Sequence, residues 1–230
     1  MRQIVLDTET TGLDPRTGDR IVEIGCVELV NRKLTGNNFH HYLNPERDSD
    51  PRALEVHGLT TEFLSDKPKF AEIAAALSAY AQGAEVIIHN APFDLGFLDA
   101  EYQKLGLPSF VSQIGGVIDT LVKAKEIHPG KRNSLDALCE RYGISNAHRQ
   151  LHGALLDSEL LADVYLAMSR GQNSLVIDEP TEPSHQIDTA HDISSVQIIV
   201  RVADESEVAA HDQLLAGLAK SGKCIWQAEQ

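Results

Sequence analysis

The sequence has few cysteines and aromatic residues, and it contains no long run of apolar residues. Its three cysteines, Cys26, Cys139 and Cys224, are odd in number, far apart and in no CxxC spacing. We expect them to be reduced and structural, with a functional role for one of them as the alternative. No stretch approaches the ~18 apolar residues needed to cross a bilayer, and no signal segment precedes the first predicted strand. These absences predict a cytoplasmic protein that does not bind a membrane.

Basic residues are also scarce. The chain has 20 basic and 34 acidic residues, which gives a formal net charge of −14. Up to Gly171 there are 17 basic and 24 acidic residues, and after it 3 and 10, so each part carries −7. This charge argues against a protein that grips nucleic acid through a broad basic surface. Any contact with nucleic acid must be local, and metal ions would have to offset the phosphate charge.

Apolar periodicity predicts an α/β domain that ends near Gly171. Three early strands, of which the second and third are antiparallel, are followed by helices that alternate with two further strands. The strands are expected at 4–9, 21–30, 34–43, 85–89 and 115–118, and the helices at 51–57, 70–82, 93–105, 119–125, 133–142 and 152–170. A further short turn of helix should begin at 60–62 and stop at Lys67-Pro68. The last of these helices is apolar nearly all round, so it should be buried in the core.

The composition changes after the first domain. Residues 178–192 contain Pro180, Pro183 and mixed acids, which favours a flexible linker. A strand at 196–200 and an amphipathic helix at 205–220 should form a small final unit. Because some 40 residues are too few to bury a stable core unaided, this unit is expected to dock on a partner. The predicted boundaries are therefore 1–171 for the domain, 172–192 for the linker and 193–230 for the C-terminal segment.

The first strand ends in two acids. Because side chains alternate between the faces of a strand, Asp7 and Glu9 should share one face and leave Thr8 on the other. Two neighbouring carboxylates repel each other, so such a pair usually faces a cation or is solvated. A hard cation with oxygen ligands is one interpretation. The alternative is a strand that frays into a polar turn.

Three other residues could join this pair. Asp94 follows the strand at 85–89, at the start of a helix, although the helix dipole alone could favour an acid there. Asp157 lies on the buried helix, where pairing with an arginine is the alternative explanation. His152 precedes it by five residues and could turn toward the same cleft, but a lone histidine is more often structural. Four acids and a histidine that can reach one cleft nevertheless predict a joint site.

These residues carry a resemblance to a known family. The segments Asp7-x-Glu9 with Thr-Thr-Gly, His-Asn-Ala-x-Phe-Asp94 and His152-x4-Asp157 resemble the three motifs of the DEDDh family of 3′-to-5′ exonucleases. Within it, the segments 34–40, 130–136 and 151–168 and the closing Cys-Ile-Trp resemble the epsilon-type proofreading subunits of bacterial DNA polymerase III. The resemblance implies a ribonuclease-H-like fold with a mixed five-stranded sheet flanked by helices.

The resemblance also implies hydrolysis of DNA from its 3′ end with two divalent cations, Mg²⁺ or Mn²⁺. Asp7 would bridge both ions, Glu9 and Asp157 would complete the first site, and these three acids would also meet the substrate. Asp94 would serve the second ion, largely through water. His152 would be the general base.

Substrate and partner contacts follow from the same resemblance. The residues implied in holding the terminal nucleotide are Thr8, Thr10, Arg52 and His57. Arg52 stands where close relatives often carry an acid, which leaves a carried-over role open. The pair Lys131-Arg132 either contacts DNA phosphate or lies in a solvated loop. Residues 172–177 resemble a sliding-clamp-binding peptide anchored by Gln172, Leu175 and Ile177, with a frayed helix end as the alternative.

The C-terminal segment would bind the polymerase (alpha) subunit, and a small accessory (theta-like) subunit could bind the domain. Two other functions are consistent with the motifs. One is a DEDDh exoribonuclease, which would leave residues 172–230 unexplained. The other is a structural adaptor with a vestigial nuclease site.

Overall fold

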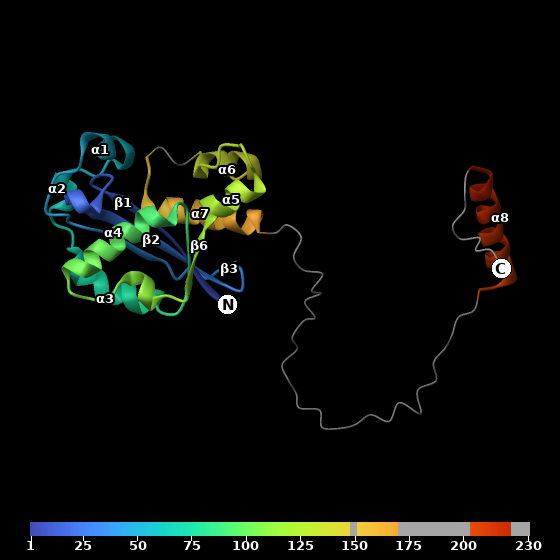
Figure 1. Ribbon diagram of the computed structural model, residues 1–230, viewed down its shortest axis with the longest axis horizontal. Helices are drawn as coiled ribbons and strands as arrows, with labels where there is room; N and C mark the ends of the chain where they lie inside the picture. Colours follow the sequence, from blue (N-terminus) through green and yellow to red (C-terminus); the bar gives the residue numbers. More distant parts are fainter. Residues whose placement is uncertain (148–150, 170–202, 222–230) are drawn as a thin grey trace, which may run out of the picture. The chain divides into compact units, whose positions relative to one another are not determined.

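The computed structural model describes residues 1–147, 151–169 and 203–221. Within these residues, six strands form one mixed sheet: β1 (Arg2–Thr10), β2 (Ile21–Val30), β3 (Lys33–Leu34), β4 (Phe39–Tyr42), β5 (Glu85–Ile88) and β6 (Gly116–Asp119). The order is β3-β2-β1-β5-β6, and β4 also pairs with β2 (Figure 1). β1 is antiparallel to β2 and parallel to β5, so it lies at the centre of the sheet.

The predicted strand at 34–43 is interrupted, which is why there are six strands and not five. Both parts, β3 and β4, pair with β2. Between them Gly36 adopts a left-handed conformation with φ 79°. Thr35 donates through its hydroxyl to the Glu28 carboxylate at 2.7 Å, and the Asn37 amide donates to the same oxygen at 3.3 Å. The Thr35 amide still donates to the Glu28 carbonyl at 3.1 Å, and regular pairing with β2 resumes at Phe39.

The helices agree with the predicted ones to within a few residues at each end. They are α1 (Pro51–His57), α2 (Thr61–Leu64), α3 (Phe70–Ala81), α4 (Ala91–Lys104), α5 (Thr120–Ile127), α6 (Leu135–Tyr142) and α7 (Ala154–Met168). Two short 3-10 helices, η1 (Pro15–Thr17) and η2 (Phe110–Gln113), occupy stretches where no helix was predicted. α1 begins as its sequence predicts, since the Asp50 carboxylate accepts a hydrogen bond from the Arg52 amide and Pro51 is the first helical residue.

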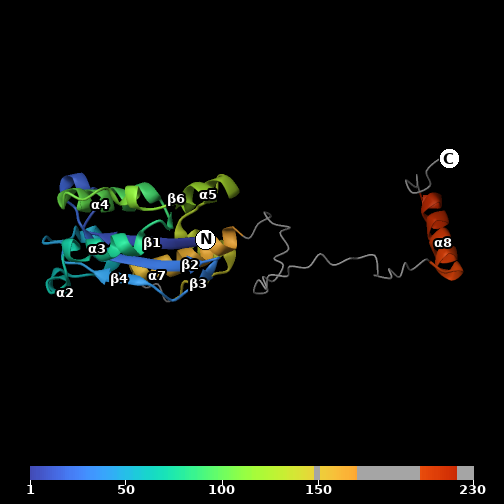
Figure 2. The ribbon, with the colours of Figure 1, turned by 90° about the horizontal axis from the view of Figure 1, so that it is seen from below.

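The sheet is covered on both faces, and β1 contributes to each in alternation. Ile4 and Leu6 belong to a core cluster with α3 and α4, whereas Val5 packs with Leu161 and Tyr165 of α7. Figure 2 shows α4 and α7 on opposite sides of β1 and β2. The odd-numbered residues of β1 therefore face α7, as the alternation of side chains along a strand predicts.

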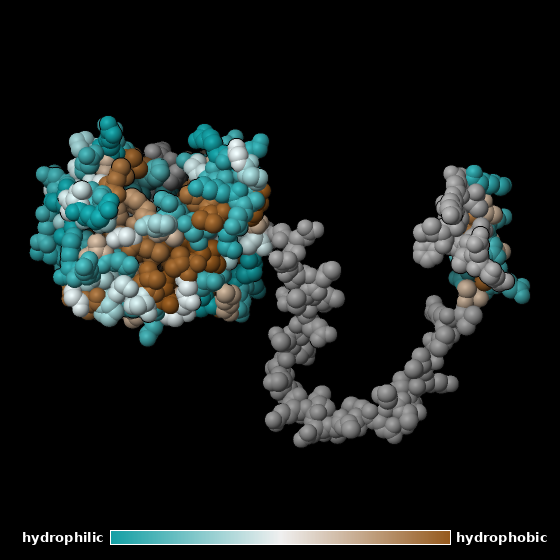
Figure 3. Space-filling view, viewed as in Figure 1, coloured by the Kyte–Doolittle hydropathy of each residue, from teal (hydrophilic) through white to brown (hydrophobic). Residues whose placement is uncertain are grey.

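Three further features of the described residues are an apolar surface patch, two buried cysteines and the lack of a membrane-spanning helix. Figure 3 shows an apolar patch beside β6, the edge strand of the sheet, where Val117 is 38% exposed. Cys26 and Cys139 are buried, and burial raises the pKa of the Cys26 thiol, which makes it a structural residue. No helix among the described residues is long and apolar enough to span a membrane.

The chain divides into two compact units, Met1–Leu175 and Val176–Gln230. In the second unit the predicted helix at 205–220 is present as α8 (Glu205–Ser221). The predicted strand at 196–200, the linker and Cys224 lie outside the described residues. The predicted boundary after Gly171 remains a prediction.

Candidate active site

The five side chains that the motifs single out line one cavity of about 370 Å³. Asp7 and Glu9 come from β1, Asp94 comes from the first turn of α4, and His152 and Asp157 come from the start of α7 and the residues before it. Further lining residues are Thr8, His89, Phe93, Leu121, Ser134, Leu135, Asp136 and Leu161. Residues separated by 150 positions in the chain thus surround a single space.

Glu9, Asp157 and His152 are the most closely spaced members. One carboxylate oxygen of each acid and one ring nitrogen of His152 lie within 4.8 Å of one another. Glu9 is 9% exposed and Asp157 3%, while the His152 side chain is 44% exposed. The distance from His152 Nδ1 to Asp157 Oδ2 is 3.4 Å. Two buried carboxylates that converge in this way match the oxygen-donor set that Mg²⁺ or Mn²⁺ prefers.

The close approach of α7 to the sheet depends on Gly25. This residue pairs with Asp7 across β1 and β2, and its carbonyl accepts a hydrogen bond from the Ser158 hydroxyl at 2.9 Å. A Cβ atom at Gly25 would lie 2.2 Å from the carbonyl carbon of Ala154. Only glycine therefore lets the first turn of α7 reach β2 and bring Asp157 beside Asp7 and Glu9.

Asp94 reaches the cavity from the other face of the sheet. Its Oδ1 accepts hydrogen bonds from the Thr8 amide at 3.0 Å and the Thr8 hydroxyl at 2.7 Å. Burial raises the pKa of this carboxyl to about 7, although the two bonds from Thr8 oppose the shift. A carboxylate whose charged form is disfavoured by burial gains most from a cation, so Asp94 fits a second metal-binding position.

The turn at Asn90, just before α4, is held by hydrogen bonds to Asp119. Asn90 adopts the left-handed conformation, with φ 71°, which asparagine tolerates better than most residues. The Asp119 carboxylate accepts bonds from the amides of Asn90 at 3.3 Å and Ala91 at 3.1 Å. Sequence reasoning did not find Asp119, because its role depends on the neighbouring strand β6. It also assigned no role to His89, Phe93 and Asp136, although the first two lie in the recognised His-Asn-Ala-x-Phe-Asp segment and Asp136 ends the recognised segment 130–136.

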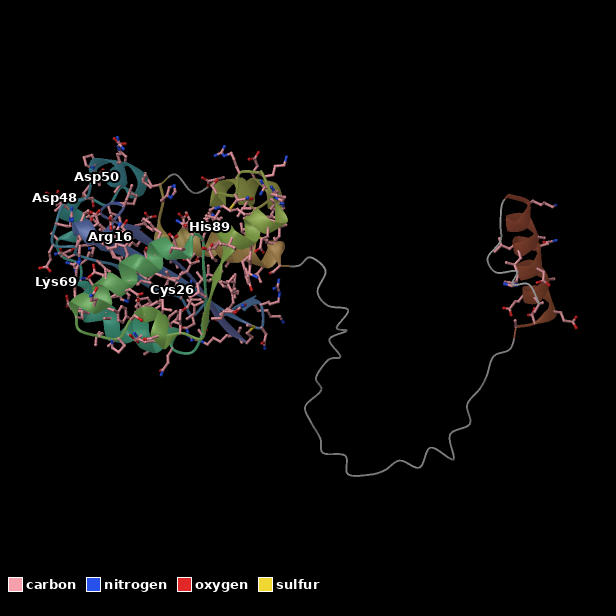
Figure 4. The ribbon with its side chains drawn as sticks, in the orientation of Figure 1. Arg16, Cys26, Asp48, Asp50, Lys69 and His89 are labelled. Atoms are coloured by element: carbon pink, nitrogen blue, oxygen red, sulfur yellow. The ribbon has the colours of Figure 1, made fainter. Side chains whose placement is uncertain are left out.

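A second, larger cavity of about 750 Å³ adjoins the first, since Thr8, Glu9 and Phe93 line both. The four residues expected to meet the terminal nucleotide all line this cavity: Thr8, Thr10, Arg52 and His57. Its rim is formed by the residues that lead into α1, with Asp48 and Asp50 beside the start of that helix (Figure 4). We call this larger cavity the nucleotide cleft.

His57 presents an unsatisfied donor in the nucleotide cleft. The side chain is buried, and its Nδ1 accepts a hydrogen bond from the Leu59 amide at 2.9 Å. The ring proton of neutral His57 is therefore on Nε2, which has no hydrogen-bond partner among the described residues. Burial lowers the pKa of His57, and the nearby Thr10 carbonyl offsets part of this effect. His57 therefore lines the cleft as a neutral imidazole whose Nε2 donor is itself buried, close to the Thr10 carbonyl.

The loop with Lys131 and Arg132 is held in place by its own contacts. The Asn133 amide donates to the carbonyls of His128 at 3.3 Å and Lys131 at 3.2 Å, and Arg141 donates to the Arg132 carbonyl at 2.7 Å. Both basic residues are exposed, and Ser134, two residues after Arg132, lines the smaller cavity. The clamp-peptide residues Gln172, Leu175 and Ile177 lie outside the described residues.

Comparison with known proteins identifies the family of the chain. Residues 4–165 match the exonuclease family RNase_T. The DNA polymerase III subunit epsilon of Pasteurella multocida (strain Pm70) is 50% identical, over 98% of this chain and 93% of that protein. The Escherichia coli (strain K12) subunit is 49% identical, over 99% and 98%. A structure of exonuclease X in complex with 5′ overhanging duplex DNA matches with a TM-score of 0.58 and 27% identity, over 73% of this chain and 91% of that one. The chain belongs to the exonuclease family and, within it, to the DNA polymerase III epsilon subunits.

Proposed function

We propose that Asp7, Glu9, Asp94, His152 and Asp157 carry out the 3′-to-5′ exonuclease reaction of this proofreading subunit. The observation that supports this assignment is their convergence on one cavity, which adjoins a cleft large enough for a nucleotide. The reaction removes mismatched nucleotides from a primer end and releases 5′-nucleotides. Water adds to the scissile phosphorus, the bond from phosphorus to the 3′ oxygen breaks, and the 3′ oxygen leaves with a proton.

The acids would hold two divalent cations. Asp7 would contact both, Glu9 and Asp157 would complete the first site, and Asp94 would serve the second. When bound, the cations would activate the attacking water and neutralise charge on the phosphate and on the leaving oxygen. Because the N-terminal part of the chain is itself acidic, such cations are also needed for a polyanionic substrate to approach these carboxylates.

His152 is assigned as the general base. Its side chain is 44% exposed and its Nδ1 lies 3.4 Å from Asp157, so the ring stands at the mouth of the cavity. A neutral imidazole can accept the proton that the attacking water loses. The neighbouring Asp157 carboxylate stabilises the imidazolium that results.

The nucleotide cleft would receive the terminal nucleotide. The neutral ring of His57 forms part of its wall, and Thr8 and Thr10 line the wall next to Glu9. Arg52 adds a positive charge on the exposed rim, where it suits a phosphate.

The names of the relatives support the proposed partners. They are named as subunits of DNA polymerase III and match this chain over nearly its whole length, including residues 193–230. We assign this segment to binding of the polymerase (alpha) subunit, and α8 offers the exposed apolar residues Val208 and Leu214 for it. Residues 172–177 would bind the sliding clamp weakly, and an accessory subunit would bind the domain. This role implies a cytoplasmic location.

Digestion of a primer labelled at its 3′ end tests the proposal. The full chain should release labelled 5′-nucleotides from a mismatched DNA end only when Mg²⁺ or Mn²⁺ is present. A version that ends at Gly171 should retain hydrolysis and lose binding to the polymerase subunit. Faster digestion of short RNA than of mismatched DNA would favour an exoribonuclease. Absence of any hydrolysis with either cation would favour a structural adaptor.

A further inference from the structure

The short helix α1 is tied at both ends to the elements that carry the active site. At its start, the Asp50 amide donates a hydrogen bond to the Thr11 carbonyl, just beyond β1, at 2.7 Å. Near its end, the Val56 carbonyl accepts a hydrogen bond from the His152 amide at 3.0 Å. Figure 1 shows α1 beside the segment that enters α7. The helix thus links the strand of the two acids to the backbone of the general base.

A side-chain contact reinforces the second tie. Gly58 ends α1 in the left-handed conformation, with φ 72°. A Cβ atom at Gly58 would lie 2.6 Å from Cδ1 of Leu151, the residue before His152. Leu151 therefore packs directly on the end of α1, although its own side chain is 51% exposed. Packing onto a backbone that only glycine permits fixes the distance between α1 and the residues that lead to His152.

The same turn of α1 forms a wall of the nucleotide cleft. Ala53, Val56 and His57 line that cleft. Val56 is involved in both contacts, because its side chain lines the cleft while its carbonyl accepts the His152 amide. The unsatisfied Nε2–H of His57 is one residue further on. A nucleoside that packs on Val56, which is 43% exposed, would immobilise the turn whose carbonyl holds the His152 amide.

We infer that α1 couples filling of the nucleotide cleft to the placement of His152, with Leu151 and Gly58 as the positioning residues. The inference rests on the proposed function, since it requires His152 to be the base and the cleft to hold the terminal nucleotide. The coupling makes hydrolysis selective for phosphodiesters that carry a nucleoside. A phosphodiester that leaves the cleft empty can still reach the metal-binding acids. In that case His152 is not held in the position that the reaction requires.

The test compares two small substrates on the full chain and on its Leu151→Ala variant. The p-nitrophenyl ester of thymidine 5′-monophosphate fills the cleft, whereas bis(p-nitrophenyl) phosphate has no nucleoside. Leu151→Ala should lower kcat for the thymidine ester about tenfold and leave the rate for the second ester within about twofold, because only the first reaction uses a correctly placed base. Leu151→Met, which keeps the contact with Gly58, should restore most of the loss.

Leu107→Ala is a matched control, because Leu107 is similarly exposed, at 43%, and lines neither cavity. It should leave both rates unchanged. An equal loss on both esters in Leu151→Ala, or no loss on either, would overturn the coupling. Gly58→Ala provides a second variant and should reproduce the selective loss. If the unmodified chain hydrolyses neither ester with Mn²⁺ present, the proposed function itself fails.

Discussion

Gly25 and Asp7 lie directly opposite each other on β2 and β1, and the missing side chain of the first sets the surroundings of the second. The start of α7 occupies the space where a Cβ atom of Gly25 would be. Gly25→Ala should therefore push α7 away from the sheet, destabilise the protein by ~1 to 3 kcal/mol and separate Asp157 from Glu9. Urea unfolding gives the stability change, and the exonuclease rate should fall by a larger factor than the decrease in folded fraction explains.

Gly96→Ala is the control for this substitution. Gly96 lies within α4, and a Cβ atom there would have no neighbour within 4 Å. Since alanine is the better helix former by ~0.5 to 1 kcal/mol, this variant should be as stable as the parent or slightly more stable. Equal effects of the two substitutions on rate and stability would contradict the role given to Gly25.

His152→Ala tests the assignment of the base. The variant should lower kcat by ~100-fold or more, because the proton of the attacking water loses its acceptor. The four acids remain, so the affinity for Mn²⁺ should be nearly unchanged. This affinity is measured by titrating Mn²⁺ into the protein in the absence of substrate. Turnover close to that of the parent chain would remove His152 from this role.

Several features of the site could be predicted from local sequence alone. The period of two places Asp7 and Glu9 on the face of β1 that α7 covers, and the buried α7 carries an acid that needs a partner. Other features depend on which segments become neighbours in the fold. Gly25 and Asp119 are ordinary residues in their own strands, and they act only because α7 and α4 pack beside them.

The interruption of the predicted strand at 34–43 has a similar cause. Its apolar and polar pattern is compatible with continuous pairing along β2. At the break Gly36 adopts a left-handed conformation, and Glu28, on the neighbouring strand, accepts hydrogen bonds from the side chains of Thr35 and Asn37. A side-chain contact across strands leaves no periodic signal in the sequence, so five strands were expected where six are found.

The raised pKa of Asp94 predicts a dependence of stability on pH in the absence of metal. Burial raises this pKa to about 7, from 3.8 for the free group. Between these values the folded state binds more protons than the unfolded state, so the free energy of unfolding should fall as pH rises from about 4 to 7. Desolvation lowers the pKa of buried His57 and of half-buried His89, so these two groups make the free energy of unfolding rise with pH below pH 6.5.

The contribution of Asp94 is therefore measured by difference. Urea unfolding in EDTA at pH 5 and at pH 8 is compared for the parent chain and for Asp94→Asn, which cannot ionise. The parent should lose more stability than the variant between the two pH values, and saturating Mn²⁺ should remove the difference, because a cation favours the carboxylate. Identical pH dependence in EDTA would show that Asp94 is not held in its neutral form.

The exposed pair Lys131 and Arg132 leads to a prediction about ionic strength. These two side chains could neutralise phosphates of the DNA strand where it extends out of the active site. If they do, salt cations must neutralise those phosphates when both residues are replaced by alanine. The slope of log K for single-stranded DNA against log salt concentration should then flatten by ~0.7 for each phosphate that the protein no longer neutralises. Because the effect lies in binding and not in chemistry, kcat for the thymidine ester should not change. Lys33→Ala, on β3, removes a charge from an element that lines neither cavity and serves as the control. A salt dependence as steep as that of the parent chain would identify the loop as merely solvated.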